Sequence, residues 1–196
     1  NVMQTRRELL RAGLGAGALL SLPALAAAQD SRPVAGDAQG AGSLVIYAVR
    51  HAEKAGGRDP DLTPEGTTRA AALARVLQHV DLDHVYSTET KRTRATGAPA
   101  AEAKGLEITS YKPFGNDLPK LLASGEGGQT VLVVGHSNTV PALVKAFGLE
   151  PGVPVDPKHG PLLQGYEDLF MIVATKGAKP FVQRLTYGPK SEAKGH

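Results

Sequence analysis

The sequence predicts an α/β domain, a three-layer α/β/α sandwich built around a mostly parallel central sheet. Short continuous apolar runs alternate along the chain with segments whose apolar residues recur at helical spacing. Continuous apolar runs are typical of strands buried on both faces, as in a parallel sheet with helices on either side. A length of 196 residues and a hydrophobic content of 41% suit one ordinary domain with tails.

The first predicted strand and helix carry clear local signals. Residues 43–49 form a short apolar run that predicts a buried strand. Residues 62–80 predict a helix, because Thr63 is a good N-cap, Pro64 suits the first helical position and apolar residues follow on one face. The chain therefore opens its domain with a strand and a crossover helix.

The middle of the domain repeats this alternation with shorter elements. Residues 84–88 predict a second strand, and residues 89–98 a short helix that we expect to stop near Pro99. Residues 106–111 predict a third strand, and residues 118–123 another short helix.

The last part of the domain contains the strongest strand signal. Residues 130–135 are apolar and rich in valine, so they predict a central strand. Residues 138–148 predict a helix with Pro141 in its first turn. Residues 168–175 and 181–187 predict two closing strands, which we interpret as a hairpin.

The amino-terminal residues 1–28 predict an export signal. Paired Arg6 and Arg7 precede an apolar stretch, and small residues form a cleavage site after Ala28. The arginine pair resembles a twin-arginine signal, so we expect a bacterial protein that is exported folded and is periplasmic or secreted. An amphipathic or uncleaved anchor helix is the alternative. The chain has no cysteine and therefore needs no disulfide in an oxidising compartment.

Composition divides the remaining chain and excludes some partners. We expect a flexible linker over residues 29–42, the folded domain over 43–188 and a tail over 189–196. The signal holds +2 of the formal charge of +3 and leaves the rest close to neutral, so charge gives no reason to expect a nucleic-acid partner. No apolar window approaches the ~18 residues of a membrane span. The oligomeric state stays open.

Three predicted strands end in charged residues that a buried strand does not need. Arg50 and His51 follow the first strand, Arg92 lies after the second, and His136 follows the fourth. Ligands bind where parallel strands end, so these residues should meet in one crevice. The histidines could ligate a metal, but arginines repel a cation and suit phosphate oxygens. The histidine chemistry that fits phosphate is nucleophilic attack on phosphorus.

The stretches "RHAEK", "YSTETKRTRAT" and "VVGHSNT" resemble, in order and spacing, the motifs of the histidine phosphatase superfamily. The superfamily is also called phosphoglycerate-mutase-like, and the resemblance runs over residues 44–174, in the manner of its short single-domain branch. It implies that His51 is the phosphorylated nucleophile and that Arg50, Arg92 and His136 bind the phosphate. It also implies that the enzyme needs neither metal nor other cofactor.

The leaving-group acid and several neighbours are less clear from the motifs. In "SYKPFGNDLPK" Asp117 is the only acid, and we interpret it as the proton donor, with Glu53 as a weaker rival. Asn138 either contacts phosphate or caps the following helix. Arg94 and Lys54, which belong to the same motifs, are interpreted as charges exposed to solvent.

Together these features predict an exported, metal-independent phosphohydrolase that acts on phosphomonoesters through a phosphohistidine intermediate. The expected partner is a small phosphorylated substrate, either a simple phosphomonoester or an envelope sugar phosphate. One alternative is a phosphate-binding or anion-binding domain without catalysis. Another is a protein phosphohistidine phosphatase, which fits export poorly. Mutase activity is not expected, because no long insertion closes the crevice.

Overall fold

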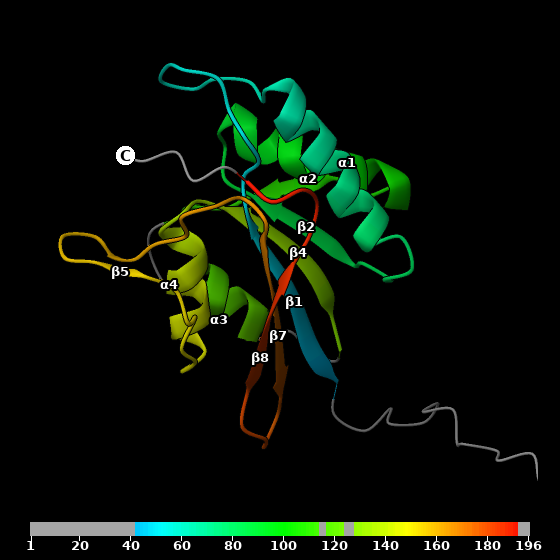
Figure 1. The fold of residues 1–196 in the computed structure, drawn as a ribbon. Coiled ribbons are helices and arrows are strands. Elements are labelled where there is room, and N and C mark those ends of the chain that lie inside the picture. Colours follow the sequence, from blue (N-terminus) through cyan, green and yellow to red (C-terminus); the bar gives the residue numbers. More distant parts are fainter. Residues whose placement is uncertain (1–41, 114–116, 124–127, 192–196) are drawn as a thin grey trace, which may run out of the picture. The chain divides into compact units, whose positions relative to one another are not determined.

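The computed structural model describes residues 42–113, 117–123 and 128–191 (Figure 1). The predicted signal peptide, and residues 29–41 of the predicted linker, lie outside the described residues. The strands of the main sheet are β1 (Ser43–Arg50), β2 (His84–Ser87), β3 (Ile108–Ser110), β4 (Thr130–Gly135), β7 (Asp168–Thr175) and β8 (Phe181–Thr186). The helices are α1 (Pro64–Val76), α2 (Lys91–Lys104), α3 (Asp117–Ala123) and α4 (Thr139–Ala146).

The six strands are arranged in the order β3-β2-β4-β1-β7-β8. β3, β2, β4 and β1 run parallel, whereas β7 pairs antiparallel with β1 and β8 pairs antiparallel with β7. Helices α1 and α2 cover one face of this sheet, and α3 and α4 cover the other (Figure 1). The predicted three-layer α/β/α fold with a mostly parallel sheet is confirmed.

The two central strands explain why their sequences are apolar without interruption. In β1, Ile46 and Ala48 pack in the cluster beneath α3 and α4, while Val49 packs in the cluster beneath α1 and α2. In β4, Val133 and Val134 divide between the two clusters in the same way. A strand that is covered on both faces buries both alternating sets of side chains, so neither set can be polar.

Helix α1 begins as its sequence predicts. The Thr63 side chain accepts a hydrogen bond of 3.2 Å from the backbone N–H of Gly66, and Pro64 occupies the first helical position. Gly66 is required by close packing, because a Cβ atom there would overlap the carbonyl oxygen of Glu53. The start of α1 is thereby fixed against the segment that follows β1.

The prediction that the second helix stops near Pro99 is wrong. Helix α2 continues through Pro99 to Lys104 and ends at Gly105, which has a left-handed φ of 64°. A proline removes one backbone donor from a helix. Small residues on the same helix pack closely on the sheet, since a Cβ added at Gly97 would lie 3.3 Å from Val134. Contact with the sheet therefore outweighs the local break.

The remaining elements follow the predictions, with two differences. Helix α4 has Pro141 in its first turn, and β7 and β8 form the expected hairpin. Strand β3 is shorter than the predicted strand over residues 106–111. The sequence also did not predict the small hairpin formed by β5 (Val155–Asp156) and β6 (Gly160–Pro161). In the described part of the chain, no helix has the length and hydropathy needed to cross a bilayer.

Candidate active site

The carboxyl ends of three parallel strands meet at one edge of the sheet. Arg50 at the end of β1 pairs in register with Gly135 at the end of β4, and Ser87 at the end of β2 pairs with Val134. The residues that follow these strands are consequently brought together. The rings of His51 and His136 lie 5.5 Å apart between centroids, at an interplanar angle of 69°.

His51 is held in one orientation by backbone groups. The backbone N–H of His51 donates to the carbonyl oxygen of Gly135 (2.9 Å). In the ring, Nδ1 lies 2.8 Å from the carbonyl oxygen of Ala52. A carbonyl can only accept, so Nδ1 carries the proton and donates it to Ala52. In the neutral ring, Nε2 then has a free lone pair. This is the nitrogen that a nucleophilic histidine needs.

Ala52, whose carbonyl oxygen orients the His51 ring, is itself held by a hydrogen bond to α2. The N–H of Ala52 donates to the hydroxyl oxygen of Thr96 (2.9 Å), whose own O–H donates to the carbonyl oxygen of Arg92 (2.7 Å). Thr96 is fully buried within α2. Helix α2 thus supports the loop after β1, and it also supplies Arg92.

Burial and neighbouring cations keep His51 neutral. The pKa of His51 is lowered to about 3, mainly by burial and also by the charges of Arg50 and Arg92 and the neighbouring His136, against the opposing effect of the hydrogen bond to Ala52. The side chain is 4% exposed. Near neutral pH the imidazole is therefore unprotonated and able to act as a nucleophile.

Arg50 is buried beside His51 without a matching negative charge. Its Nη1 donates to three successive carbonyl oxygens, those of Leu163, Gln164 and Gly165, at 3.2, 3.4 and 3.2 Å. Its guanidinium carbon lies 4.2 Å from the centre of the Tyr166 ring. Burial lowers the pKa of Arg50, and its Nε has no hydrogen-bond partner among the described residues. Arg50 is thus a buried cation that forms no ion pair with any described residue, and such a cation suits an anionic ligand.

The two arginines of the second motif, Arg92 and Arg94, have different surroundings. Arg92 is largely buried, its Nη1 lies 3.6 Å from the Asp59 carboxylate, and its Nε has no partner within the described ranges. Arg94 instead donates to the Ser110 hydroxyl (3.0 Å) in an exposed position. Because the charge of Arg92 acts on the pKa of His51, the structure brings Arg92 and not Arg94 to the site.

His136 lies opposite His51 and is positioned by two threonines. Its Nε2 lies 3.0 Å from the Thr88 hydroxyl, and its backbone N–H donates to the hydroxyl oxygen of Thr139 (2.8 Å). Burial, followed by the charges of Arg92 and Arg50, lowers the pKa of His136 to about 4. His136 is thus also neutral in the empty site.

The remaining predicted residues have different surroundings. Asn138 occupies the N-cap position of α4 without a capping hydrogen bond from its side chain, and its contact with phosphate stays a prediction. Asp117 is the first residue of α3, and its side chain lies outside what the structure describes. Its role as proton donor stays a prediction. Lys54 lies outside the central group and forms an isolated bridge with Leu62.

Glu53 is not free to serve as the acid. Its carboxylate accepts hydrogen bonds from Nε and Nη2 of Arg69 at 2.7 to 3.0 Å. Arg69 is 1% exposed and also donates to the carbonyl oxygens of Tyr187 and Pro189. The suggestion of Glu53 as a rival proton donor is therefore wrong, because the ion pair engages both of its oxygens.

Comparison with known proteins agrees with this geometry. The family model of the histidine phosphatase superfamily (branch 1) matches residues 46–114, which contain the first two motifs. The order of the elements and the placement of His136 against His51 supply the third motif. Residues 46–114 are thus similar in sequence to the histidine phosphatase superfamily.

The histidine phosphatase fold is shared with several solved structures. A protein of Agrobacterium tumefaciens, provisionally assigned as the phosphohistidine phosphatase SixA, is 23% identical, with 72% of this chain and 97% of that chain covered and a TM-score of 0.54. A mycobacterial glucosyl-3-phosphoglycerate phosphatase in complex with inorganic phosphate is 16% identical, with 73% and 96% covered and a TM-score of 0.55. A Bacillus anthracis phosphoglycerate mutase is 16% identical, with 74% and 93% covered and a TM-score of 0.53. At these identities the likeness shows the fold.

A curated relative is more similar in sequence over a shorter stretch. Phosphoserine phosphatase 1 of Hydrogenobacter thermophilus is 43% identical over 71 residues, which is 32% of this chain. The match spans 34% of that relative, so this chain covers about a third of its length.

The candidate site adjoins a pocket that the sequence predicted only in part. A cavity of about 380 Å³ is lined by Thr88, Glu89 and Tyr111 together with His136. Glu89 directly follows Thr88 in the second motif, so its place at a strand end was a usable signal. Tyr166 had no local signal, because its contact with Arg50 joins segments far apart in the sequence.

Across the described ranges, no group of three or more His, Asp or Glu side chains could hold a metal ion.

Proposed function

We propose that the chain is a phosphohydrolase that cleaves phosphomonoesters through a covalent phosphate on His51, and that it is exported and independent of metal. The observation that carries the proposal is the hydrogen bond from Nδ1 of His51 to the carbonyl of Ala52 (2.8 Å). It leaves Nε2 unprotonated beside two cations with unused donors, Arg50 and Arg92. A neutral nucleophile next to an anion site is what phosphoryl transfer requires.

The first step forms a phosphorus–nitrogen bond. Nε2 of His51 attacks phosphorus while the ester phosphorus–oxygen bond breaks, and the leaving alkoxide takes a proton from an acid. Negative charge on the three phosphoryl oxygens is met by Arg50, Arg92 and a donated hydrogen bond from His136. The Ala52 carbonyl accepts from Nδ1–H and thus stabilises the positive ring that results.

The second step regenerates the enzyme with water. A water molecule attacks phosphorus, the phosphorus–nitrogen bond breaks and its electrons return to Nε2 of His51. The acid, now a carboxylate, takes the proton of the water, so that inorganic phosphate leaves and the site is restored. The arginines supply the positive charge that a metal supplies in other phosphatases, which supports metal independence.

Two carboxylates can fill the acid role. Asp117 is the acid predicted from the stretch "SYKPFGNDLPK", and Glu89 lines the same pocket as His136. Asp117→Asn and Glu89→Gln distinguish them when an alkyl and an aryl phosphate are compared. Loss of the donor should reduce alkyl ester turnover by about a hundredfold or more, because an alkoxide leaves poorly without a proton, and should affect the aryl ester much less. Equal losses on both esters would exclude the acid role for that residue.

Two of the similar proteins support a phosphomonoester substrate without identifying it, whereas the SixA structure is named for phosphohistidine. One similar protein is named a phosphoserine phosphatase and another a glucosyl-3-phosphoglycerate phosphatase. Both names describe cleavage of a phosphate ester at a carbon-bound oxygen. Export is supported only by the signal in residues 1–28, and fusion of that segment to a reporter would test it.

The central test is replacement of the nucleophile. We expect His51→Ala to abolish turnover of a generic aryl phosphate, and a chelator to leave wild-type turnover unchanged. Mass spectrometry after an acid-free quench should find a phosphate on His51 that disappears during a chase. Retained turnover in the variant, or loss with chelator, would overturn the proposal.

A binding domain without turnover is the second candidate, favoured by one observation. Arg50 and Arg92 have Nε donors without a partner among the described residues, whereas Glu53, one of the carboxylates weighed from the sequence, is engaged by Arg69. Binding of phosphate or vanadate with no covalent adduct, and with Asp117→Ala and Glu89→Ala indistinguishable from wild type, would favour this candidate.

A further inference from the structure

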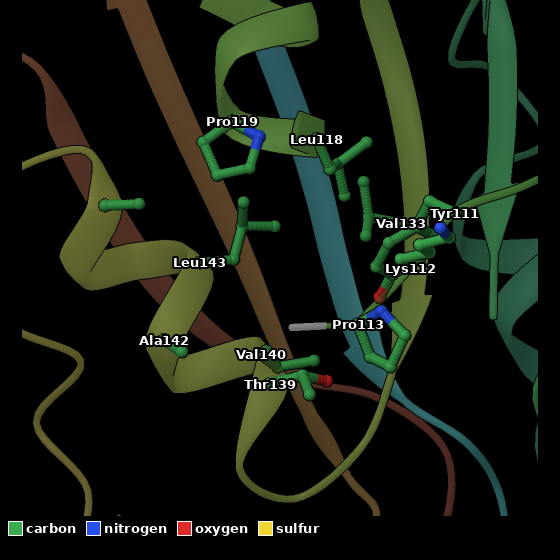
Figure 2. Close-up of a pocket in the computed structure, with 11 residues that line it drawn as sticks. Tyr111, Lys112, Pro113, Leu118, Pro119, Val133, Thr139, Val140, Ala142 and Leu143 are labelled. Carbon is green, nitrogen blue, oxygen red and sulfur yellow. The ribbon is translucent and has the colours of Figure 1, made fainter. Parts of the chain in front are cut away.

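A second cavity adjoins the one that contains His136. It has a volume of about 210 Å³ and lies between α3, α4 and the sheet (Figure 2). The two cavities adjoin each other, because both are lined by Tyr111, Lys112 and Pro113. Thr139, whose hydroxyl accepts from the backbone of His136, also lines it. A substrate held by its phosphate at the histidines would therefore have this cavity as its neighbour.

The walls of the second cavity are apolar. Figure 2 shows Val140 and Leu143 of α4 on one side, with Leu118 of α3 and Val133 of β4 closing the others. Leu118, Val133, Val140 and Leu143 are all buried members of one hydrophobic core cluster. The cavity is thus an opening into the apolar core that shares part of its lining with the cavity of His136.

The hydroxyl groups in this wall are already hydrogen-bonded within the protein. The Tyr111 hydroxyl donates to the carbonyl oxygen of Val134 (3.3 Å), and the Thr139 hydroxyl oxygen accepts from the N–H of His136 (2.8 Å). Lys112 is exposed at the shared rim. A ligand with many hydroxyl groups would lose water in this cavity and gain few hydrogen bonds in return.

We propose that this cavity binds the leaving group of the substrate, and that the substrate is a phosphomonoester whose organic part is an apolar ring or short chain. This rests on the proposed function, since the phosphate must be held by Arg50, Arg92 and His136. An apolar cavity of about 150 Å³ accommodates a benzene ring. The cavity here is larger, at about 210 Å³, and so has room for a ring with a short linker. A sugar phosphate is correspondingly disfavoured.

The test compares phosphate esters of primary alcohols, so that the chemistry of the leaving oxygen stays similar. 2-Phenylethyl phosphate, ethyl phosphate and glycerol 1-phosphate are assayed with the wild-type protein. We expect kcat/KM for 2-phenylethyl phosphate to exceed the values for the other two by about tenfold or more. Ethyl phosphate serves as the reference, because its organic part is too small to fill the cavity.

Variants that narrow the cavity should remove this preference. Ala142 and Ala146 line the cavity but are exposed on α4, so Ala142→Phe and Ala146→Phe can fill its mouth without entering the core. We expect the preference for 2-phenylethyl phosphate to fall to less than about twofold, mainly through a higher KM. Ala71→Phe is the matched control, since Ala71 is exposed on α1 and does not line the cavity.

The outcomes separate this inference from the proposed function. If wild type cleaves all three esters with equal efficiency, or if both cavity variants retain the preference while Ala71→Phe behaves identically, the leaving-group site is wrong and the phosphatase stands. If wild type cleaves none of the esters and no phosphate forms on His51, the proposed function fails and the inference fails with it.

Discussion

Two buried arginines near the end of β1 have opposite surroundings. Arg69 of α1 is 1% exposed, and the Glu53 carboxylate accepts from its Nε and Nη2. Its other donors reach the carbonyl oxygens of Tyr187 and Pro189. Arg50 is 7% exposed and forms no ion pair with any described residue, and its Nε lacks a partner there. One cation is saturated and the other is not.

The difference shows how to tell a structural cation from one that binds a ligand. Burial by itself lowers the pKa of an arginine, and for Arg50 this effect prevails. For Arg69 burial acts in the same direction, but the hydrogen bonds and charge of Glu53 outweigh it and raise the pKa. A buried cation without its own counter-ion is stabilised when an anion arrives. Arg50 is therefore suited to phosphate, and Arg69 to holding α1 on the sheet.

The largest expected effect is on activity when the unsaturated arginine is removed. Arg50→Met should lower kcat/KM by about a thousandfold, because charge on the transferring phosphoryl group loses a fixed donor. Its cost in folding should be smaller than that of Arg69→Met. Steady-state kinetics and urea unfolding of both variants check this. Near-normal activity in Arg50→Met would contradict the comparison.

Removing the saturated arginine should instead affect stability. Arg69→Met leaves the Glu53 carboxylate and two backbone carbonyls without their donor, so we expect the free energy of unfolding to fall by about 3 kcal/mol. The double variant Glu53→Leu/Arg69→Met is the control and should recover part of this loss. If the double variant is no more stable than Arg69→Met, the pair is not the stabilising unit inferred here.

Phosphate sharpens the contrast, since only Arg50 should respond to it. Inorganic phosphate at about 100 times its Kd should raise the free energy of unfolding of the wild type by about 2.7 kcal/mol. Arg50→Met should gain much less, whereas the Glu53→Leu/Arg69→Met variant should gain as much as wild type. Urea unfolding with and without phosphate measures each value. Equal stabilisation of all three proteins would show that the anion binds elsewhere.

The pH dependence of stability tests the uncompensated charge around His51. Its pKa is lowered from 6.5 to about 3, so between these values the unfolded chain binds a proton that the folded chain does not. Stability therefore rises with pH in this window and falls as pH drops from 7 to 5, by about 2 kcal/mol from His51. His51→Gln should show a smaller fall than wild type. Identical falls in the two proteins would refute the burial of a neutral histidine.

Much of the fold could be predicted because its signals are local. Continuous apolar runs marked β1 and β4, since a strand covered on both faces has no polar side. Thr63 and Pro64 marked the start of α1, because capping needs only neighbouring residues. Charged residues at the ends of buried strands predicted that Arg50, His51 and His136 lie at one edge of the sheet.

Other features depended on contacts that no local pattern contains. Helix α2 passes Pro99 because its small residues pack on the sheet, which a break signal cannot reveal. Glu53 lies within the first motif, yet its partner Arg69 determines that it is structural. Arg69 in turn bonds to the backbone of Tyr187, 118 residues away.

By itself the sequence determined which residues stand at the strand ends and what chemistry their types allow. Only the tertiary structure decided which of these groups are free to act. The carbonyl of Ala52 determines which ring nitrogen of His51 carries the proton. Tyr166 lies against the guanidinium of Arg50, and α3, α4 and β4 enclose the cavity proposed for the leaving group. The physical reason is that side-chain type and period are written locally, whereas burial and partner choice arise when distant segments pack together.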